Sequence, residues 1–115
     1  MKKLSFFLLF LLAAGCGRPS DVAVSPEEGA KIIASTPDLY LIDVRPAEAF
    51  AKKHYPNAVN MPVATFGTTI ASIPADRPVL MHCRTGRSVK TAYAILKKLR
   101  PDVTNVRYID GEPLF

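Results

Sequence analysis

Cys83 is the residue of this sequence best suited to chemistry. It follows the apolar run VLM (79–81) and His82, and it opens the segment CRTGRS (83–88), after which apolar residues recur at helical spacing. A thiolate is the reactive form of cysteine, and the N-terminus of a helix carries a partial positive charge that favours it. The segment therefore predicts a nucleophile in a turn between a strand and a helix.

The residues after Cys83 are suited to binding a small anion. Successive backbone N–H groups of a tight turn can converge on one point, and Gly86 permits backbone angles that a side chain would hinder. Two arginines add permanent positive charges that suit small oxyanions, and Lys90 is a candidate third. We expect the backbone N–H groups of the turn to favour the thiolate of Cys83. The residues expected to bind substrate are Arg84, Thr85, Gly86, Arg87 and Ser88.

Asp43 and Arg45 are candidate supporting residues at the end of another apolar run. They stand two apart, so we expect them to pair with loop groups and to hold the site in shape, with Arg45 also a candidate contact for substrate. His82 precedes Cys83 on a strand, where successive side chains point to opposite faces, so a structural role is favoured over a general base. His54 is expected to fix a loop.

The elements that must position these residues alternate along the chain. SPEE (25–28) is typical of a helix start, with a capping Ser25 and Pro26 at the first helical position, and Thr36-Pro37 ends that helix. Alternating helices and strands predict one α/β domain with a mainly parallel sheet flanked by helices, and its ligands are expected at the carboxyl ends of the strands. The predicted strands are 39–44, 58–61, 79–81 and 103–109, and the further predicted helices are 47–53, 65–73 (a weaker pattern) and one from 87 or 88 to 99.

The first residues read as a targeting segment. Lys2 and Lys3 precede an apolar run that is shorter than the roughly 20 residues that span a bilayer, which is typical of a signal peptide over residues 1–15. The segment LAAGC (12–16) resembles the lipobox of bacterial lipoproteins, which implies lipidation of Cys16, a tether over 16–24 and export to the periplasm with a membrane anchor. Simple secretion without the lipid is the alternative.

Composition limits the remaining possibilities. A chain of 115 residues has room for one core and one site, and we expect a monomer. The formal net charge is +5, which loss of the leader would lower by the charges of Lys2 and Lys3. There is no run of four or more cations, so a nucleic-acid surface has little support.

Several segments together resemble the rhodanese family of sulfurtransferases. These are LIDVR (41–45), EAF (48–50), HYPNAVNMP (54–62), CRTGRS (83–88) and VRYIDGE (106–112), within a domain expected over 25–115. Protein tyrosine phosphatases also place His-Cys before such a turn, but the arginine that clamps their phosphoryl group would fall at Val89. A valine cannot hold a phosphate, so the phosphatase alternative is disfavoured.

The resemblance implies a double displacement of sulfur. Cys83 would take the outer sulfur of thiosulfate or a similar anionic donor as a persulfide and pass it to cyanide or a thiol, with no metal and no organic cofactor. Two departures from the family pattern are Asn57, where glycine is usual, and Asp110-Gly111, which replaces a Gly-Gly pair. The alternative function is a non-catalytic rhodanese module that binds a partner or senses reactive sulfur.

Overall fold

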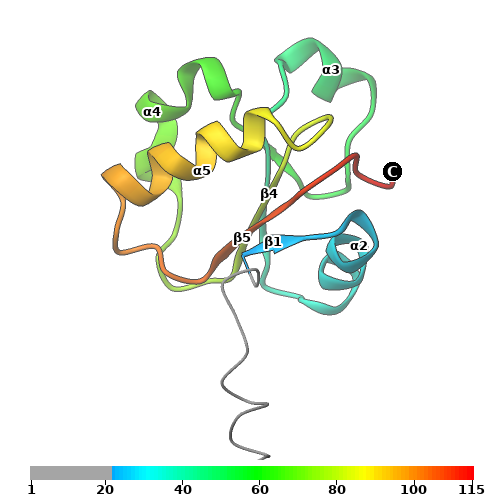
Figure 1. Cartoon of the computed structure of the whole chain (residues 1–115), viewed down its shortest axis with the longest axis horizontal. Coiled ribbons are helices and arrows are strands. Elements are labelled where there is room, and N and C mark those ends of the chain that lie inside the picture. The colour runs from blue at the N-terminus through cyan, green and yellow to red at the C-terminus, as the bar shows by residue number, and fades with distance from the viewer. Residues whose placement is uncertain (1–21) are drawn as a thin grey trace, which may run out of the picture.

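A parallel sheet forms the centre of the computed structural model, which describes residues 22–115 (Figure 1). Its described strands are Ala23–Val24 (β1), Tyr40–Asp43 (β2), Val59–Asn60 (β3), Val79–His82 (β4) and Val106–Ile109 (β5). They are ordered β1-β5-β4-β2-β3, and each neighbouring pair is parallel. The predicted α/β class with a mainly parallel sheet is confirmed.

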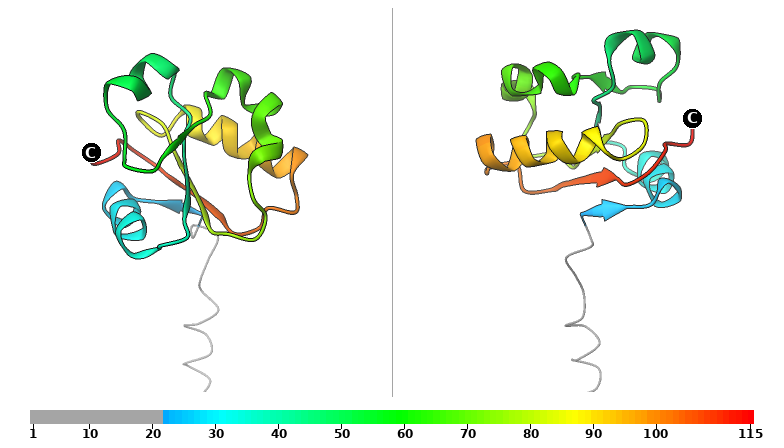
Figure 2. Two further views of the ribbon diagram at one scale, coloured as in Figure 1. Left: turned by 180° about the vertical axis from the view of Figure 1, so that it is seen from behind. Right: turned by 45° about the horizontal axis from the view of Figure 1, so that its top comes forward.

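Helices cover both faces of this sheet. The helices are Pro26–Ser35 (α2), Ala47–Lys52 (α3), Phe66–Thr69 (α4) and Ser88–Leu99 (α5), and the 3₁₀ turns Val63–Thr65 (η2) and Ile70–Ser72 (η3) flank α4. Figures 1 and 2 show α4 and α5 on one side and α2 on the other. As predicted, Ser25 caps α2, because its hydroxyl accepts a hydrogen bond from the Glu28 N–H at 3.0 Å.

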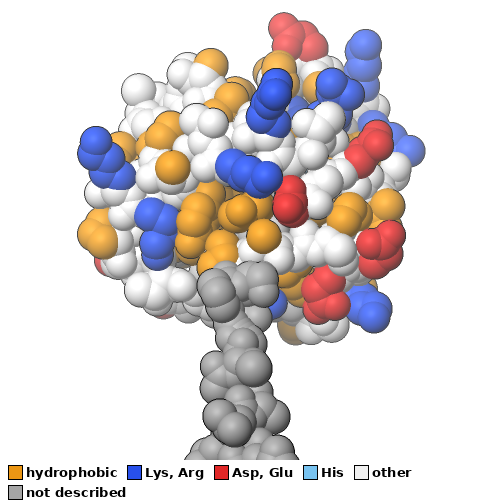
Figure 3. Space-filling model, viewed as in Figure 1, with side chains coloured by type: hydrophobic (Ala, Val, Ile, Leu, Met, Phe, Trp, Pro, Cys, Tyr) orange, Lys and Arg blue, Asp and Glu red, His pale blue; other side chains and the backbone are white. Residues whose placement is uncertain are grey.

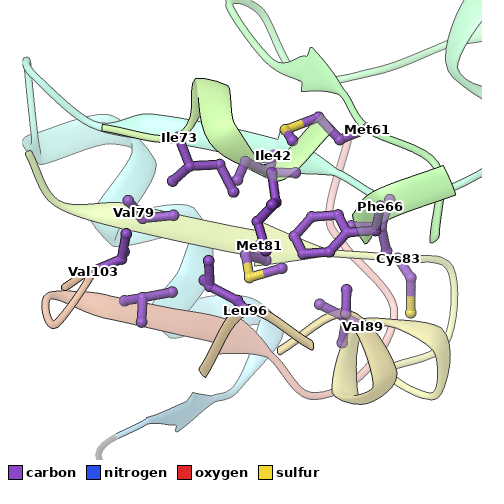
Figure 4. Packing of buried hydrophobic residues seen from close by; sticks show 14 residues of the cluster. Ile42, Met61, Phe66, Ile73, Val79, Met81, Cys83, Val89, Leu96 and Val103 are labelled. Carbon is purple, nitrogen blue, oxygen red and sulfur yellow. The ribbon is translucent and has the colours of Figure 1, made fainter. Parts of the chain in front are cut away.

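Side-chain alternation along the strands separates the core into two layers. Ile42 and Met81 face α4 and α5, where Phe66 and Leu96 are fully buried (Figure 4). Their sequence neighbours, such as Leu80, pack on the opposite side together with α2. The central strand β4 is buried on both faces, which explains why its sequence is an uninterrupted apolar run rather than an alternating one.

Three predicted segments differ from the structure by more than one residue at a boundary. The tether was predicted to reach residue 24, but Ala23–Val24 form β1, because their backbone pairs with the edge of β5. The last strand begins at Val106 rather than at 103, and the weak helix at 65–73 is broken into α4 and η3. The predicted signal peptide, the rest of the tether and the lipidated Cys16 lie outside the described residues.

Asn57 occupies a backbone conformation that explains the family's preference for glycine there. Its φ is +67°, and it is the one residue other than glycine with positive φ in the described part of the chain. Asparagine tolerates this left-handed region better than most residues do. The turn before β3 therefore keeps its shape despite the missing glycine.

Among the helices of residues 22–115, none has the length and apolar character needed to cross a membrane.

Candidate active site

Cys83 lies directly after β4, at the carboxyl end of the sheet where ligands were expected. Its side chain is 2 % exposed and lies beside Val89 and Phe66 in the layer under α4 and α5 (Figure 4). The Gly86 N–H donates a hydrogen bond to the Cys83 Sγ over 3.1 Å. An N–H donor in such apolar surroundings stabilises a negative sulfur more than it would in water.

The turn from Cys83 to α5 requires glycine at position 86. Gly86 has a φ of +98°, and a Cβ added there would lie 2.6 Å from the Gly111 nitrogen and 3.0 Å from the Asp110 Oδ1. The turn is thus packed directly against the segment after β5. Lys90 of α5 joins the same contact, since its Nζ lies 3.3 Å from the Asp110 Oδ1.

Fewer backbone N–H groups bond to the Cys83 sulfur than the sequence predicted. Among residues 22–115, Gly86 supplies the hydrogen bond to Cys83, and the backbone N–H groups of Arg84, Thr85, Arg87 and Ser88 form none with that sulfur. Lys90 pairs with Asp110, so its charge is shared with a carboxylate. Whether Cys83 is held as a thiolate stays a prediction.

A cavity of about 290 Å³ opens beside the thiol. It brings together candidates from two distant parts of the sequence, because Arg45 and Pro46 follow β2 whereas Cys83 and Arg84 follow β4. Thr85 and Arg87 are exposed and do not line it. The full lining is Arg45, Pro46, Ala49, Cys83, Arg84 and Ser88. The cavity thus places two arginines beside Cys83.

Asp43 and Arg45 pair mainly with each other, whereas the sequence analysis expected each to pair with loop groups. The Arg45 Nε donates to both Asp43 carboxylate oxygens at 3.0 Å, and Nη2 donates to Oδ2 at 2.7 Å. Nη2 also donates to the Lys53 carbonyl at 2.6 Å, which ties the end of α3 to the end of β2. The Asp43 side chain is fully buried and that of Arg45 is 10 % exposed, so the pair fixes one wall of the cavity.

His82 lies behind this wall and not beside the thiol. Its ring packs on the face of the sheet opposite Cys83, as side-chain alternation predicted. Its Nε2 lies 3.8 Å from the Asp43 Oδ2 and has no hydrogen-bond partner among residues 22–115. Burial lowers the pKa of His82 below its ordinary value of 6.5, which outweighs the opposing effect of Asp43. The lowered pKa favours the neutral ring above pH 6.5, and the position behind the wall fits the structural role that was predicted.

His54 has the loop role that was predicted. Its Nδ1 lies 2.6 Å from the Phe50 carbonyl oxygen, and its ring stacks on the Phe50 ring with centroids 3.8 Å apart. These contacts close the connection after α3.

The sequence reasoning missed three residues that support the cavity wall. The Asn60 side-chain amide donates to the carbonyls of Asp43 and Arg45, at 3.0 and 2.9 Å. Tyr55 and Phe115 pack edge to face at 5.0 Å, and the Arg45 guanidinium carbon lies 4.8 Å from the centre of the Phe115 ring. Asn60 and Tyr55 fall within the segment at 54–62 that resembled the family, whereas nothing in the sequence pattern pointed to Phe115.

Two other surfaces lack the chemistry of this cavity. A larger cavity, about 410 Å³, lies near the start of β2, and its described lining includes Tyr40 and Arg77 but no cysteine, histidine or carboxylate. On the face drawn in Figure 3, Lys and Arg side chains are separated by uncharged surface and by Asp and Glu. Within residues 22–115, no three His, Cys, Asp or Glu side chains gather as metal ligands would.

Comparison with known proteins agrees with this geometry. The chain is 28 % identical over 85 residues to a sulfurtransferase of Allochromatium vinosum, covering 73 % of this chain and 79 % of that protein. It is 34 % identical over 71 residues to the thiosulfate sulfurtransferase GlpE of Pseudomonas savastanoi pv. phaseolicola, covering 62 % and 65 % respectively. An HTH-type transcriptional regulator of Mycobacterium tuberculosis is 33 % identical over 70 residues, which are 56 % of this chain and 31 % of the regulator.

Solved structures show the same architecture. The human single-domain sulfurtransferase TSTD1 superposes with a TM-score of 0.64 at 25 % identity, over 79 % of this chain and 90 % of that one. The profile of the rhodanese-like domain family matches residues 25–112, which include the whole turn after Cys83. The chain therefore belongs to the rhodanese-like domain family.

Proposed function

We propose that this protein is a sulfurtransferase that moves the outer sulfur of thiosulfate, or of a similar anionic donor, to a thiophilic acceptor through a persulfide on Cys83. One observation carries the proposal. The Cys83 Sγ accepts a hydrogen bond from the Gly86 N–H, and Cys83 lines a cavity together with two arginines. The sulfurtransferase relatives support the same reaction class.

In the first half-reaction the Cys83 thiolate attacks the outer sulfur of thiosulfate. A new S–S bond forms to Cys83 while the S–S bond of thiosulfate breaks, and the bonding electrons of that bond leave with sulfite. The negative charge moves onto the terminal sulfur of the persulfide. The Gly86 N–H, already directed at the Cys83 sulfur, is placed to stabilise the charge that remains near it.

The donor's oxygens are negatively charged, so their binding requires positive charge in the cavity. Arg45 and Arg84 line it, and the Ser88 hydroxyl is available for a hydrogen bond. Within residues 22–115 the Arg45 Nη1 makes no hydrogen bond, so this donor remains for the substrate. Arg87 is exposed on the turn, where its charge attracts the anion before it enters the cavity; Thr85 is also exposed but carries no charge, and neither residue lines the cavity.

In the second half-reaction an acceptor such as cyanide or a thiolate attacks the terminal sulfur of the persulfide. The S–S bond to Cys83 breaks, its electrons return to the Cys83 sulfur, and thiocyanate or an acceptor persulfide leaves. Every named group belongs to one chain, so the reaction needs no second copy and we expect a monomer.

The test is thiocyanate formation from thiosulfate and cyanide by the full chain. We expect saturable activity with the parallel-line kinetics of a double displacement, and Cys83→Ser should reduce it to background. Cys16→Ser is the matched control, because it removes the other cysteine and leaves the cavity intact. Absence of thiocyanate from the wild type would favour the alternative, a non-catalytic module that binds a partner or senses reactive sulfur.

The proposal extends to the protein's location. Residues 1–16 suit export and lipidation of Cys16, which would anchor the domain on the periplasmic side of a bacterial membrane. Expression with a labelled fatty acid should label the wild type and not Cys16→Ser. Equal labelling of the two, or none in either, would contradict the lipid anchor.

A further inference from the structure

Arg45 makes contacts beyond its ion pair with Asp43. Asp43 holds the guanidinium from one side and the Lys53 carbonyl holds Nη2. A third contact comes from far along the chain, because the Phe115 ring lies against the guanidinium at 4.8 Å. This distance is within the roughly 6 Å over which a cation is attracted to an aromatic face.

Phe115 is itself held by the residues behind the cavity wall. Its ring packs edge to face on Tyr55 at 5.0 Å and lies 5.8 Å from the His82 ring. The Tyr55 hydroxyl accepts a hydrogen bond from the Leu114 N–H at 2.9 Å. Tyr55 is 6 % exposed, so the segment 110–115, red in Figure 1, is fastened to a buried anchor at this point.

The contact bears on the cavity because the Phe115 ring covers the Arg45 guanidinium, which its hydrogen bonds to Asp43 and Lys53 do not do. The Arg45 side chain is 10 % exposed, and it bonds only through Nε and Nη2 within the described residues. Phe115 excludes water from one face of the guanidinium, which strengthens the interaction with Asp43 and limits rotation of the planar group. Without the ring, the guanidinium is wetter and its position relative to the Cys83 side of the cavity is less defined.

We propose that Phe115, anchored by Tyr55, is a positioning residue that fixes the Arg45 guanidinium at the cavity wall and so sets the affinity for the anionic donor. This proposal rests on the function proposed above for its kinetic consequence but not for its geometry. A looser Arg45 weakens binding of the anion in the ground state and in the transition state alike. KM should then rise while kcat is kept.

Two reagents measure the position of Arg45 without any sulfur transfer. Iodoacetate and iodoacetamide both alkylate a thiol and differ mainly in the negative charge of the first. The ratio of their rates with Cys83 therefore reports the positive charge that the cavity presents to an anion. In Phe115→Ala we expect this ratio to fall about three- to tenfold and KM for thiosulfate to rise by a similar factor.

Matched variants separate positioning from folding. Phe115→Tyr keeps the ring and should keep the wild-type ratio and KM. Leu114→Ala alters the neighbouring side chain, which is 52 % exposed, and should also match the wild type. If Phe115→Ala does not fold, Phe115→Leu keeps the apolar bulk without the ring, and its ratio should fall relative to that of Phe115→Tyr.

Two results would overturn the role proposed for Phe115. An unchanged reagent ratio and KM in the ring-less variants would overturn the proposal. An equal slowing of both reagents, with kcat and KM changing together, would also overturn it, because that indicates general loosening of the site. If the wild type transfers no sulfur, the proposed function fails but the reagent ratio still tests the role of Phe115.

Discussion

Replacing Gly86 by alanine perturbs the hydrogen bond to the Cys83 sulfur and the packing of its turn at once. The added Cβ would lie 2.6 Å from the Gly111 backbone nitrogen, which cannot swing away as a flexible side chain can. It would also occupy a residue with a φ of +98°, where a side chain is disfavoured. The turn or the segment after β5 must therefore move.

The magnitude follows from these two effects. The left-handed conformation costs a non-glycine residue roughly 1–2 kcal/mol, and crowding in a packed region costs about 1–3 kcal/mol. Alanine also lowers the conformational entropy of the unfolded chain, which raises the free energy of unfolding by about 0.4–1 kcal/mol. Gly86→Ala should thus lower the free energy of unfolding by about 1–5 kcal/mol, with a central value near 3 kcal/mol, which corresponds to roughly 15 °C in Tm for a domain of this size.

Activity should fall further than stability alone explains. Displacing the Gly86 N–H by even a few tenths of an ångström weakens its bond to the Cys83 sulfur, and a comparable preorganised donor is worth about 10²–10³ in rate elsewhere. We expect at least a tenfold loss of kcat for thiocyanate formation, measured below the Tm of the variant.

The control is Gly67→Ala in α4. Gly67 is exposed, and a Cβ there would have Leu99 as its nearest neighbour at 4.0 Å, an ordinary contact. Its stability should be unchanged or about 0.5–1 kcal/mol higher, with full activity. Urea unfolding and the thiocyanate assay measure both variants. If Gly86→Ala has the free energy of unfolding and the rate of the wild type, then the turn does not depend on the packing of Gly86 against Gly111 as described.

Three further predictions concern stability and can be measured by urea unfolding. Asp43→Asn leaves Arg45 without its charge partner in a nearly buried site, so the free energy of unfolding should fall by about 3–5 kcal/mol, and a loss below 1 kcal/mol would show that the pair is not needed. Asn57→Val puts a β-branched residue at a φ of +67° and should cost roughly 1–2 kcal/mol, whereas Asn57→Gly should be close to neutral; equal effects would exclude backbone strain. Because burial lowers the pKa of His82 in the folded state, the unfolded chain binds the proton more readily. The contribution of His82 to stability is therefore present above pH 6.5 and is lost as the pH falls below it; His82→Gln should flatten this dependence below pH 6.5, and an unchanged slope would assign it to other groups.

The fold and the position of Cys83 directly after a buried strand were predictable because they depend on local patterns. The apolar run of β4 and the turn with Gly86 identify Cys83 from contiguous residues. Asp43 and Arg45 were selected as supporting residues for the same reason, since both lie at the end of one predicted strand, but their ion pair with each other was not predicted.

What the sequence did not reveal depends on contacts between distant segments. Phe115 reaches Arg45 and Tyr55 only because β5 runs beside β4 and directs the following residues across the sheet. The number of N–H groups that reach the Cys83 sulfur likewise depends on the detailed path of the turn against Gly111, which spacing cannot determine. β1 was missed because two residues are too few to show a strand pattern.

The mass of the intact protein after brief incubation with thiosulfate tests the central claim most directly. The account predicts that the wild type gains the mass of one sulfur atom on Cys83, that cyanide removes it, and that Cys83→Ser gains none. A wild-type protein whose mass does not change, or a Cys83→Ser variant that gains the same sulfur, would contradict it.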